Sequence, residues 1–109
     1  MQTIVPSEMP VAENPMGLSV RHLHETPHVM MSMLTIEPGQ AVPPHAAPVD
    51  VAFFVVEGSP VVQIEEESQQ VGPQTLIPSS AGHLHGFRND GDAPVRLLVI
   101  RTPSPHAAE

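Results

Sequence analysis

Histidines and carboxylates are the residues of this chain that could carry metal chemistry. The 109-residue sequence contains seven His and twelve Asp and Glu, but no Cys. Because thiols are absent, disulfides and thiolate catalysis are excluded, and a metal site would have to use imidazole nitrogens and carboxylate oxygens. Four such residues lie in two separate stretches, His45 and Asp50 in the first and His83 and His85 in the second. Imidazoles from separate segments can converge on one divalent transition metal, so these four are the candidate metal ligands.

The elements that must position these residues are short β-strands. Fourteen Pro and seven Gly interrupt the chain, which excludes long helices. The stretches between them are rich in β-branched and apolar residues, which indicates an all-β sandwich or barrel. The length supports a single domain, so we expect a barrel over residues 18–102, an extended N-terminal arm over residues 1–17 and a flexible tail over residues 103–109. The predicted strands are 18–24, 28–37, 51–57, 61–66, 74–77, 84–88 and 95–102.

Glycine, proline and histidine recur at defined distances in two stretches. In residues 39–58, five residues separate Gly39 from His45, and Gly58 closes the stretch. Glycine permits the sharp turns between antiparallel strands, and proline at a strand end removes no ladder hydrogen bond. The spacing therefore indicates turns between strands, and we expect the His45 side chain to point into the mouth of the barrel.

The second stretch, residues 72–89, repeats the design. Five residues separate Gly72 from Pro78, and His85 lies three residues short of Asn89. Together the two stretches resemble the two motifs of the cupin superfamily, in its small single-domain cupin-2 form. The resemblance implies a double-stranded β-helix, or jelly-roll, barrel. Proteins of this family are commonly homodimers, so the resemblance also implies a homodimer, with one metal bound by three His and one Glu.

Two ligand positions of that pattern are changed here. Ala47 stands where the first motif would carry its second His, and Val51 stands where it would carry Glu. Asp50 is the adjacent carboxylate, but neighbouring residues of a strand face opposite sides. Asp50 could therefore reach the site only through a bulge or from the start of the strand.

The second motif is also changed in its spacing. Two extra residues lie between Pro78 and His85, so the spacing alone would select His83. If this segment is extended, His83 and His85 face the same side, because they are two residues apart. We therefore predict a rearranged metal site of His45, His83 and His85, with Asp50 as a possible fourth group.

Other readings of these residues remain open. His22, His24 and His28 form another cluster, in which His22 and His24 share strand parity, and one of them could supply the missing ligand. A histidine on a half-buried strand is also commonly a hydrogen-bonded structural side chain. In the same way, Asp50 could cap a turn instead of binding a metal.

The charge and composition of the chain limit the classes of partner that it can bind. The formal charge of -8, with four Arg and no Lys, argues against a nucleic-acid surface. No apolar run reaches the ~18 residues of a membrane span, and the first residues do not resemble a signal peptide. We therefore expect a cytoplasmic protein with neither membrane nor nucleic acid as a partner. Exposed strand edges of a small barrel predict a homodimer.

Three classes of function remain. The first is a metal-dependent enzyme, of dioxygenase or isomerase type, in which Fe, Mn, Ni, Cu or Zn activates O2 or polarises a small organic substrate. The second is a metal or ligand sensor without turnover, and the third is a dimeric scaffold with a degenerate site. Arg88 and Arg96 could present a guanidinium to a substrate carboxylate, or could pair with surface acids. We predict a divalent metal in the barrel mouth and a small-molecule ligand or substrate, with the reaction left open.

Overall fold

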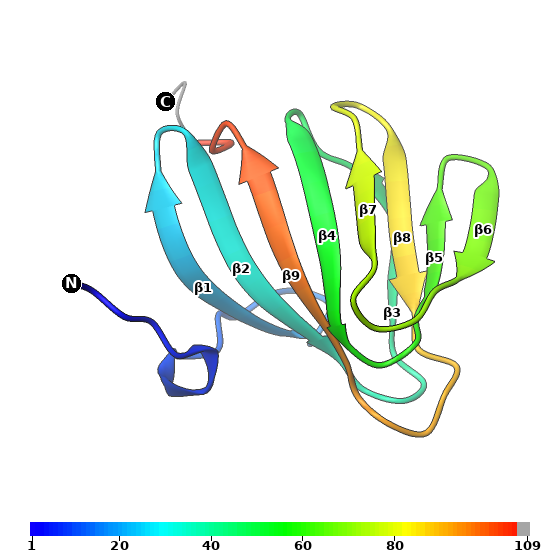
Figure 1. Ribbon diagram of the computed structural model, residues 1–109. Helices are drawn as coiled ribbons and strands as arrows, with labels where there is room; N and C mark the ends of the chain where they lie inside the picture. The colour runs from blue at the N-terminus through cyan, green and yellow to red at the C-terminus, as the bar shows by residue number, and fades with distance from the viewer. Residues whose placement is uncertain (107–109) are drawn as a thin grey trace.

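The chain forms two antiparallel β-sheets that enclose a common core (Figure 1). The computed structural model describes residues 1–106. The larger sheet has the strand order β1-β2-β9-β4-β7, and the smaller sheet has the order β3-β8-β5-β6. This arrangement confirms the all-β prediction. The strands are β1 Ser19–Thr26, β2 Val29–Ile36, β3 Ala41–Ala46, β4 Asp50–Glu57, β5 Val61–Ile64, β6 Glu67–Gln70, β7 Leu76–Ser79, β8 Leu84–Arg88 and β9 Val95–Thr102.

Two of these strands, β3 and β6, were not predicted from the sequence. β3 contains Pro43 and Pro44, which are poor strand formers. It is an edge strand of the smaller sheet, where a residue without an N–H leaves no ladder partner unsatisfied. β6 is the opposite edge strand and is exposed along its whole length. It therefore has no apolar face that a sequence pattern could reveal.

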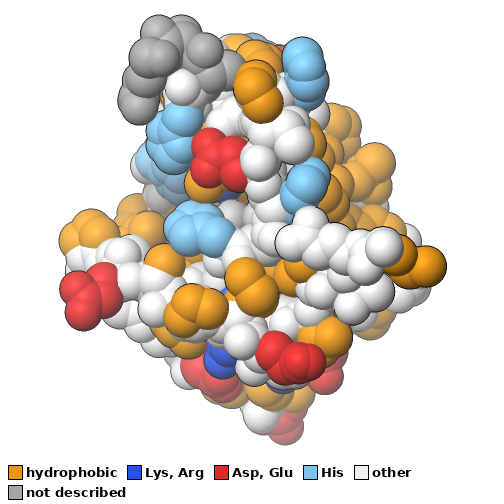
Figure 2. All heavy atoms as spheres, turned by 90° about the vertical axis from the view of Figure 1, so that its left-hand side faces the viewer, with side chains coloured by type: hydrophobic (Ala, Val, Ile, Leu, Met, Phe, Trp, Pro, Cys, Tyr) orange, Lys and Arg blue, Asp and Glu red, His pale blue; other side chains and the backbone are white. Residues whose placement is uncertain are grey.

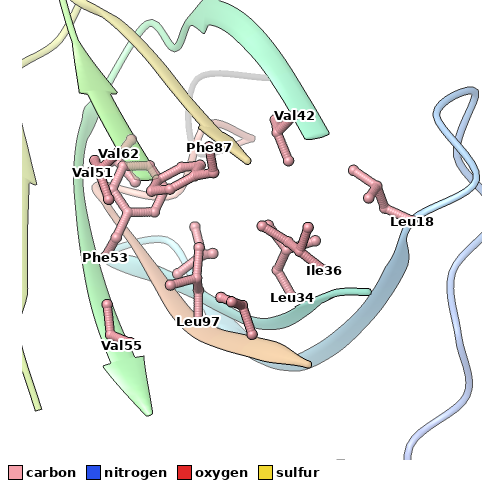
Figure 3. Close-up of a cluster of buried hydrophobic side chains, with 12 residues drawn as sticks. Leu18, Leu34, Ile36, Val42, Val51, Phe53, Val55, Val62, Phe87 and Leu97 are labelled. Atoms are coloured by element: carbon pink, nitrogen blue, oxygen red, sulfur yellow. The ribbon is translucent and has the colours of Figure 1, made fainter. Parts of the chain in front are cut away.

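The hydrophobic core lies between the sheets. Buried residues alternate along β2 and β4 and along most of β9, as expected for strands with one face inside. Phe53 of β4 packs edge to face against Phe87 of β8, with ring centroids 4.6 Å apart, and so joins the two sheets (Figure 3). The remaining buried members of the cluster are Leu18, Leu34, Ile36, Val42, Val51, Val55, Val62, Val95, Leu97 and Val99.

The N-terminal segment lies along the free edge of β1. After a short 3-10 turn, Pro6–Glu8, Ala12 forms an isolated β-bridge with Val20. Arg21 of β1 donates hydrogen bonds to backbone carbonyls at Ser7 and Met9. The predicted N-terminal arm, residues 1–17, thus contacts the edge of its own sheet at Ser7, Met9 and Ala12.

The segment after β9 lies against the hairpin between β1 and β2. The Ser104 N–H donates to the Pro27 carbonyl at 3.3 Å, and Ser104 Oγ donates to Glu25 Oε2 at 2.7 Å. His106 Nδ1 lies 2.8 Å from the same carboxylate oxygen. The predicted flexible tail ran to residue 109, and its residues 107–109 lie outside the described part of the chain. Within residues 1–106 there is no helix of the length and apolar character that a membrane span requires.

Gly58, which closes the first motif, is predicted to be essential for stability. Its φ is +88°, and an added Cβ would lie 2.7 Å from the Pro94 carbonyl oxygen and 2.9 Å from Val95 Cα. Gly58→Ala should lower the free energy of unfolding by about 3 kcal/mol, because left-handed backbone strain and overpacking each contribute about 1 to 2 kcal/mol. Gly39→Ala is the matched control, since Gly39 has a φ of +84° but open space around it. Urea unfolding should show a loss of only about 1 kcal/mol for the control. Equal losses would contradict the role assigned to the contact with Pro94 and Val95.

Candidate functional site

His45 and His85, one from each sequence motif, are direct neighbours across the ladder between β3 and β8. A β-bulge makes this pairing possible. From Val42 to His45, β3 advances three residues, while β8 advances only two between Phe87 and His85. Strict alternation would turn His45 away from the side of Val42, and the extra residue turns it back. The bulge therefore brings both imidazoles to the same face of the smaller sheet.

Gly86 allows the bulge to approach β8 closely. An added Cβ on Gly86 would lie 3.0 Å from the Val42 carbonyl oxygen and 3.1 Å from the Pro44 nitrogen. In this bulge the Pro43 carbonyl lies 3.1 Å from His45 Nδ1. A carbonyl can only accept, so Nδ1 of the neutral ring donates and Nε2 keeps its lone pair. The backbone of the bulge thus sets the tautomer of His45.

His85 is buried, with 3% of its surface exposed. Its Nδ1 shares a hydrogen bond of 3.3 Å with Ser79 Oγ, and its ring packs edge on against Phe53. Burial, with smaller contributions from the charges of His45 and Arg101, lowers the pKa of His85 to about 4. His85 is therefore neutral at pH 7, which is the form that binds a metal or accepts a proton.

The two histidines line a cavity of about 280 Å³ between the sheets. His45 is itself exposed, so the pair lies where the cavity opens to solvent. The face of the molecule that carries β1 shows histidine side chains beside hydrophobic ones (Figure 2). Size, apolar walls and a few polar groups are typical of a small-molecule site. The apolar lining is Met16, Leu18, Val20, Met30, Leu34, Val42, Phe53, Phe87, Val99 and Pro105, and the polar lining is His22, Ser32, His45, His85, Arg101 and His106.

His83 does not join the pair. β8 begins at Leu84, so His83 lies in the turn before the strand, and the shared parity with His85 does not apply. The His83 side chain is about half exposed, and its Nδ1 lies 3.8 Å from Glu65 Oε1. The structure therefore places it outside the cavity lining.

Asp50 also lies apart from the pair. It is exposed, and its Oδ1 accepts a hydrogen bond from the Ala81 N–H at 2.8 Å, which makes it a cap for the turn before β8. Its neighbour Val51 is 4% exposed and belongs to the hydrophobic cluster, and Ala47 packs against that cluster. Apolar side chains thus fill both changed ligand positions. Among residues 1–106, no three or more His, Asp or Glu side chains are arranged to hold a metal ion.

The three histidines nearest the N-terminus, His22, His24 and His28, lie in different environments. His22 lines the cavity, with its Nδ1 3.1 Å from Ser32 Oγ. A bulge in β1 pairs His22 with Ser32 and His24 with Met31, which are neighbours on opposite faces of β2. The prediction that His22 and His24 share a face is therefore wrong. His28 lies in the turn between β1 and β2.

Arg101 is a cavity residue that the sequence analysis missed. It is near the end of β9 and lines the cavity beside the histidines. The available signal was parity, because alternate residues from Val95 to Val99 are buried and Arg101 continues that series. Arg88 and Arg96, which the sequence analysis considered, form ion pairs with surface carboxylates instead.

Comparison with known proteins agrees with this architecture. A family model described as the cupin domain matches residues 32–101. The chain therefore belongs to the cupin domain family, and its fold is the double-stranded β-helix that the sequence predicted. No match was found among curated proteins.

Solved structures resemble the chain over nearly its whole length. The protein TT1209 from Thermus thermophilus is 26% identical, with a TM-score of 0.80 over 94% of this chain and 98% of its own. A predicted oxalate decarboxylase from Thermotoga maritima is 15% identical, with a TM-score of 0.82 over 94% and 99% of the two chains. The polyketide cyclase RemF from Streptomyces resistomycificus is 20% identical, with a TM-score of 0.82 over 95% and 80%. The last two likenesses define the fold alone.

The buried neutral state of His85 predicts a pH dependence of stability. The pKa is about 4 in the folded chain, against about 6.5 for an unfolded histidine, so the unfolded state takes up a proton first as the pH falls. Stability from this residue should be complete above pH 6.5 and should decline by up to about 3 kcal/mol on approaching pH 4. Urea unfolding in EDTA should show a smaller decline for His85→Gln than for the wild type. The exposed control His83→Gln should keep the wild-type decline, and an unchanged profile in His85→Gln would contradict the assignment.

Proposed function

We propose that this cupin takes a small organic molecule into the cavity between its sheets. The cavity itself carries the proposal, because it combines a volume of about 280 Å³ with apolar walls and a few polar side chains. Such concave sites with few polar groups are the usual form of small-molecule sites. A protein that served only as a dimerisation scaffold would have no need of an open cavity of this kind.

The histidine pair extends the proposal to a divalent transition metal. The ring centroids of His45 and His85 are 4.6 Å apart, close enough for both rings to reach one cation at ~2.0 to 2.1 Å. The Pro43 carbonyl accepts from Nδ1 of His45, which leaves Nε2 of that ring as a metal ligand. The Ser79 hydroxyl can donate or accept, and His85 presents Nε2 to a metal in the tautomer whose Nδ1–H donates to Ser79 Oγ. The proposal uses two protein ligands, so other coordination positions fall to water or to the organic molecule. Fe, Mn, Ni, Cu or Zn would supply Lewis acidity or O2 activation when bound.

The surrounding residues define what the chain itself contributes. Ser79 and Phe53 fix the ring of His85 and keep it away from solvent. In the tautomer whose Nδ1–H donates to Ser79 Oγ, Nε2 of this neutral ring can accept a proton from a bound molecule. His45 is the exposed member of the pair. The pair therefore lies between the apolar part of the cavity and the solvent.

The names of two structural neighbours agree with a small organic ligand. One is a predicted oxalate decarboxylase and the other a polyketide cyclase. We carry over only the class of small organic molecule, because one fold hosts many unrelated reactions.

A sensor or carrier without turnover is the second candidate. The observation that favours it is the apolar character of Ala47 and Val51, which leaves two imidazoles where the family pattern has four ligands. The predicted homodimer stays a prediction. It is supported by the edge strand β7, where Leu76 is 57% exposed.

Metal binding by the pair should depend on both histidines. Calorimetric titration of Zn2+ into tag-free protein stripped with a chelator should give one equivalent per chain. His45→Ala should weaken the affinity by more than about ten-fold, and because His45 is exposed, the variant should keep its fold. His24→Ala and His83→Ala are matched controls that should bind like the wild type. Unchanged affinity in both His45→Ala and His85→Ala would refute the proposed ligands, and a loss in His83→Ala would restore the larger predicted site.

A bulky side chain introduced into the cavity lining should prevent small molecules from binding there. Cyclohexanone and benzyl alcohol are neutral probes, and we expect each at millimolar concentration to shift the NMR signals of the methyl groups of Leu34 and Val99. Val20→Trp places an indole in the half-buried lining and should abolish these shifts. Val61→Trp is the control, since Val61 is half-buried on β5 outside this cavity. Shifts that persist in Val20→Trp, or that are absent from the wild type, would contradict a ligand-binding cavity.

A further inference from the structure

Arg101 is a cation in an apolar wall. It is partly buried near the end of β9, and it lines the cavity with Val99 and Phe53. Burial lowers the pKa of its guanidinium, and its charge contributes to the lowered pKa of His85. Removing a guanidinium from water is costly unless an anion or several acceptors compensate. A guanidinium at this position is therefore stabilised by a partner that supplies a negative charge or several acceptor atoms.

The other three arginines are all accounted for. Arg88 pairs with Asp90 at 2.7 Å, and Arg96 pairs with Glu57 at 3.2 Å. Arg21 donates to two backbone carbonyls of the N-terminal segment. Each of these guanidinium groups has its partner outside the cavity.

Arg101 differs from the other three. Within residues 1–106, no carboxylate oxygen lies within 4.0 Å of its guanidinium and no acceptor receives a side-chain hydrogen bond from it. Glu25, at the same end of the barrel, has its Oε2 engaged by Ser104 and His106. The polar groups that share the cavity are a serine and imidazoles, and neither carries negative charge. The described part of the chain thus leaves this cation without a counter-ion.

We propose that the ligand of the cavity is a small organic monocarboxylate, with its carboxylate on Arg101 and its apolar body against the walls of the barrel. A guanidinium presents paired N–H donors that match the two oxygens of a carboxylate. The interaction is stronger here than at a fully exposed site, because Arg101 is partly buried beside apolar walls that lower the local dielectric constant. This inference rests on the proposed function, since it names the chemical class of the molecule that the cavity takes.

The charge of the chain favours a monoanion over a polyanion. The formal net charge is -8, so the outer surface repels ligands that carry several negative charges. Arg101 is the one arginine or lysine among the described lining residues, and the apolar walls offer no compensation to an additional anionic group. A ligand with a single carboxylate on an apolar body fits both the negative net charge of the chain and the apolar lining of the cavity.

The test compares phenylacetate with phenylacetamide, which have the same shape and differ in charge. Binding is measured by NMR titration of the methyl signals of the wild type, Arg101→Met and Arg88→Met, all in EDTA so that a metal cannot supply the preference. We expect the wild type to bind phenylacetate at least ten-fold more tightly than phenylacetamide. Arg101→Met, which keeps a long apolar side chain, should reduce this ratio to near one. Arg88→Met removes a surface arginine and should keep the wild-type ratio.

The outcomes separate this inference from the proposed function. If cyclohexanone binds but phenylacetate and phenylacetamide bind the wild type equally, the cavity takes ligands and the role of Arg101 is refuted. A preference for phenylacetate that survives in Arg101→Met refutes it as well. If neither phenylacetate nor phenylacetamide binds while the neutral probes do, the carboxylate class is wrong. If none of the probes binds, the proposed function fails and this inference fails with it. The methyl spectrum of each variant without ligand reports whether its fold is retained.

Discussion

The register between β3 and β8 is the constraint on which the rest of the site depends. The same ladder pairs Val42 with Phe87 in the core and His45 with His85 at the cavity. Because side chains alternate along a strand, a slip of one residue would turn both His85 and Phe87 to the outer face. Core packing and site geometry are therefore held by one set of hydrogen bonds. The bulge at the prolines and the missing Cβ of Gly86 are the local features that make this register possible.

Burial then decides the electrostatic character of the site. His85 and Arg101 lie in an apolar cavity, where desolvation lowers the pKa of each. For His85 the result is a neutral imidazole at physiological pH. For Arg101, whose pKa starts far higher, the result is a retained charge that is partly buried. A chain that is acidic overall thus contains a cavity whose charged group is a cation.

The sequence allowed the fold and half of the candidate site to be predicted, and the reasons differ between residues. His45 and His85 were identified because glycine and proline spacing marks the turns that precede them. β3 and β6 were missed because edge strands tolerate proline and polar residues, so neither shows an apolar alternation. His83 was grouped with His85 by parity, which fails because the strand begins one residue after it. Bulges explain the error at His24, since an inserted residue reverses parity without leaving a clear mark in the sequence.

The amino-acid sequence by itself determined the all-β class, the two motifs and the presence of a histidine in each. Those properties follow from local preferences of glycine, proline and β-branched residues, which act within a few positions of the chain. Only the tertiary structure decided that Asp50 caps a turn, that Val51 packs in the core and that Arg101 faces the cavity. Each of these depends on where a bulge or a strand end falls when distant segments pair. Pairing across the sheets is a long-range property, so the faces that side chains occupy are settled only when the barrel closes.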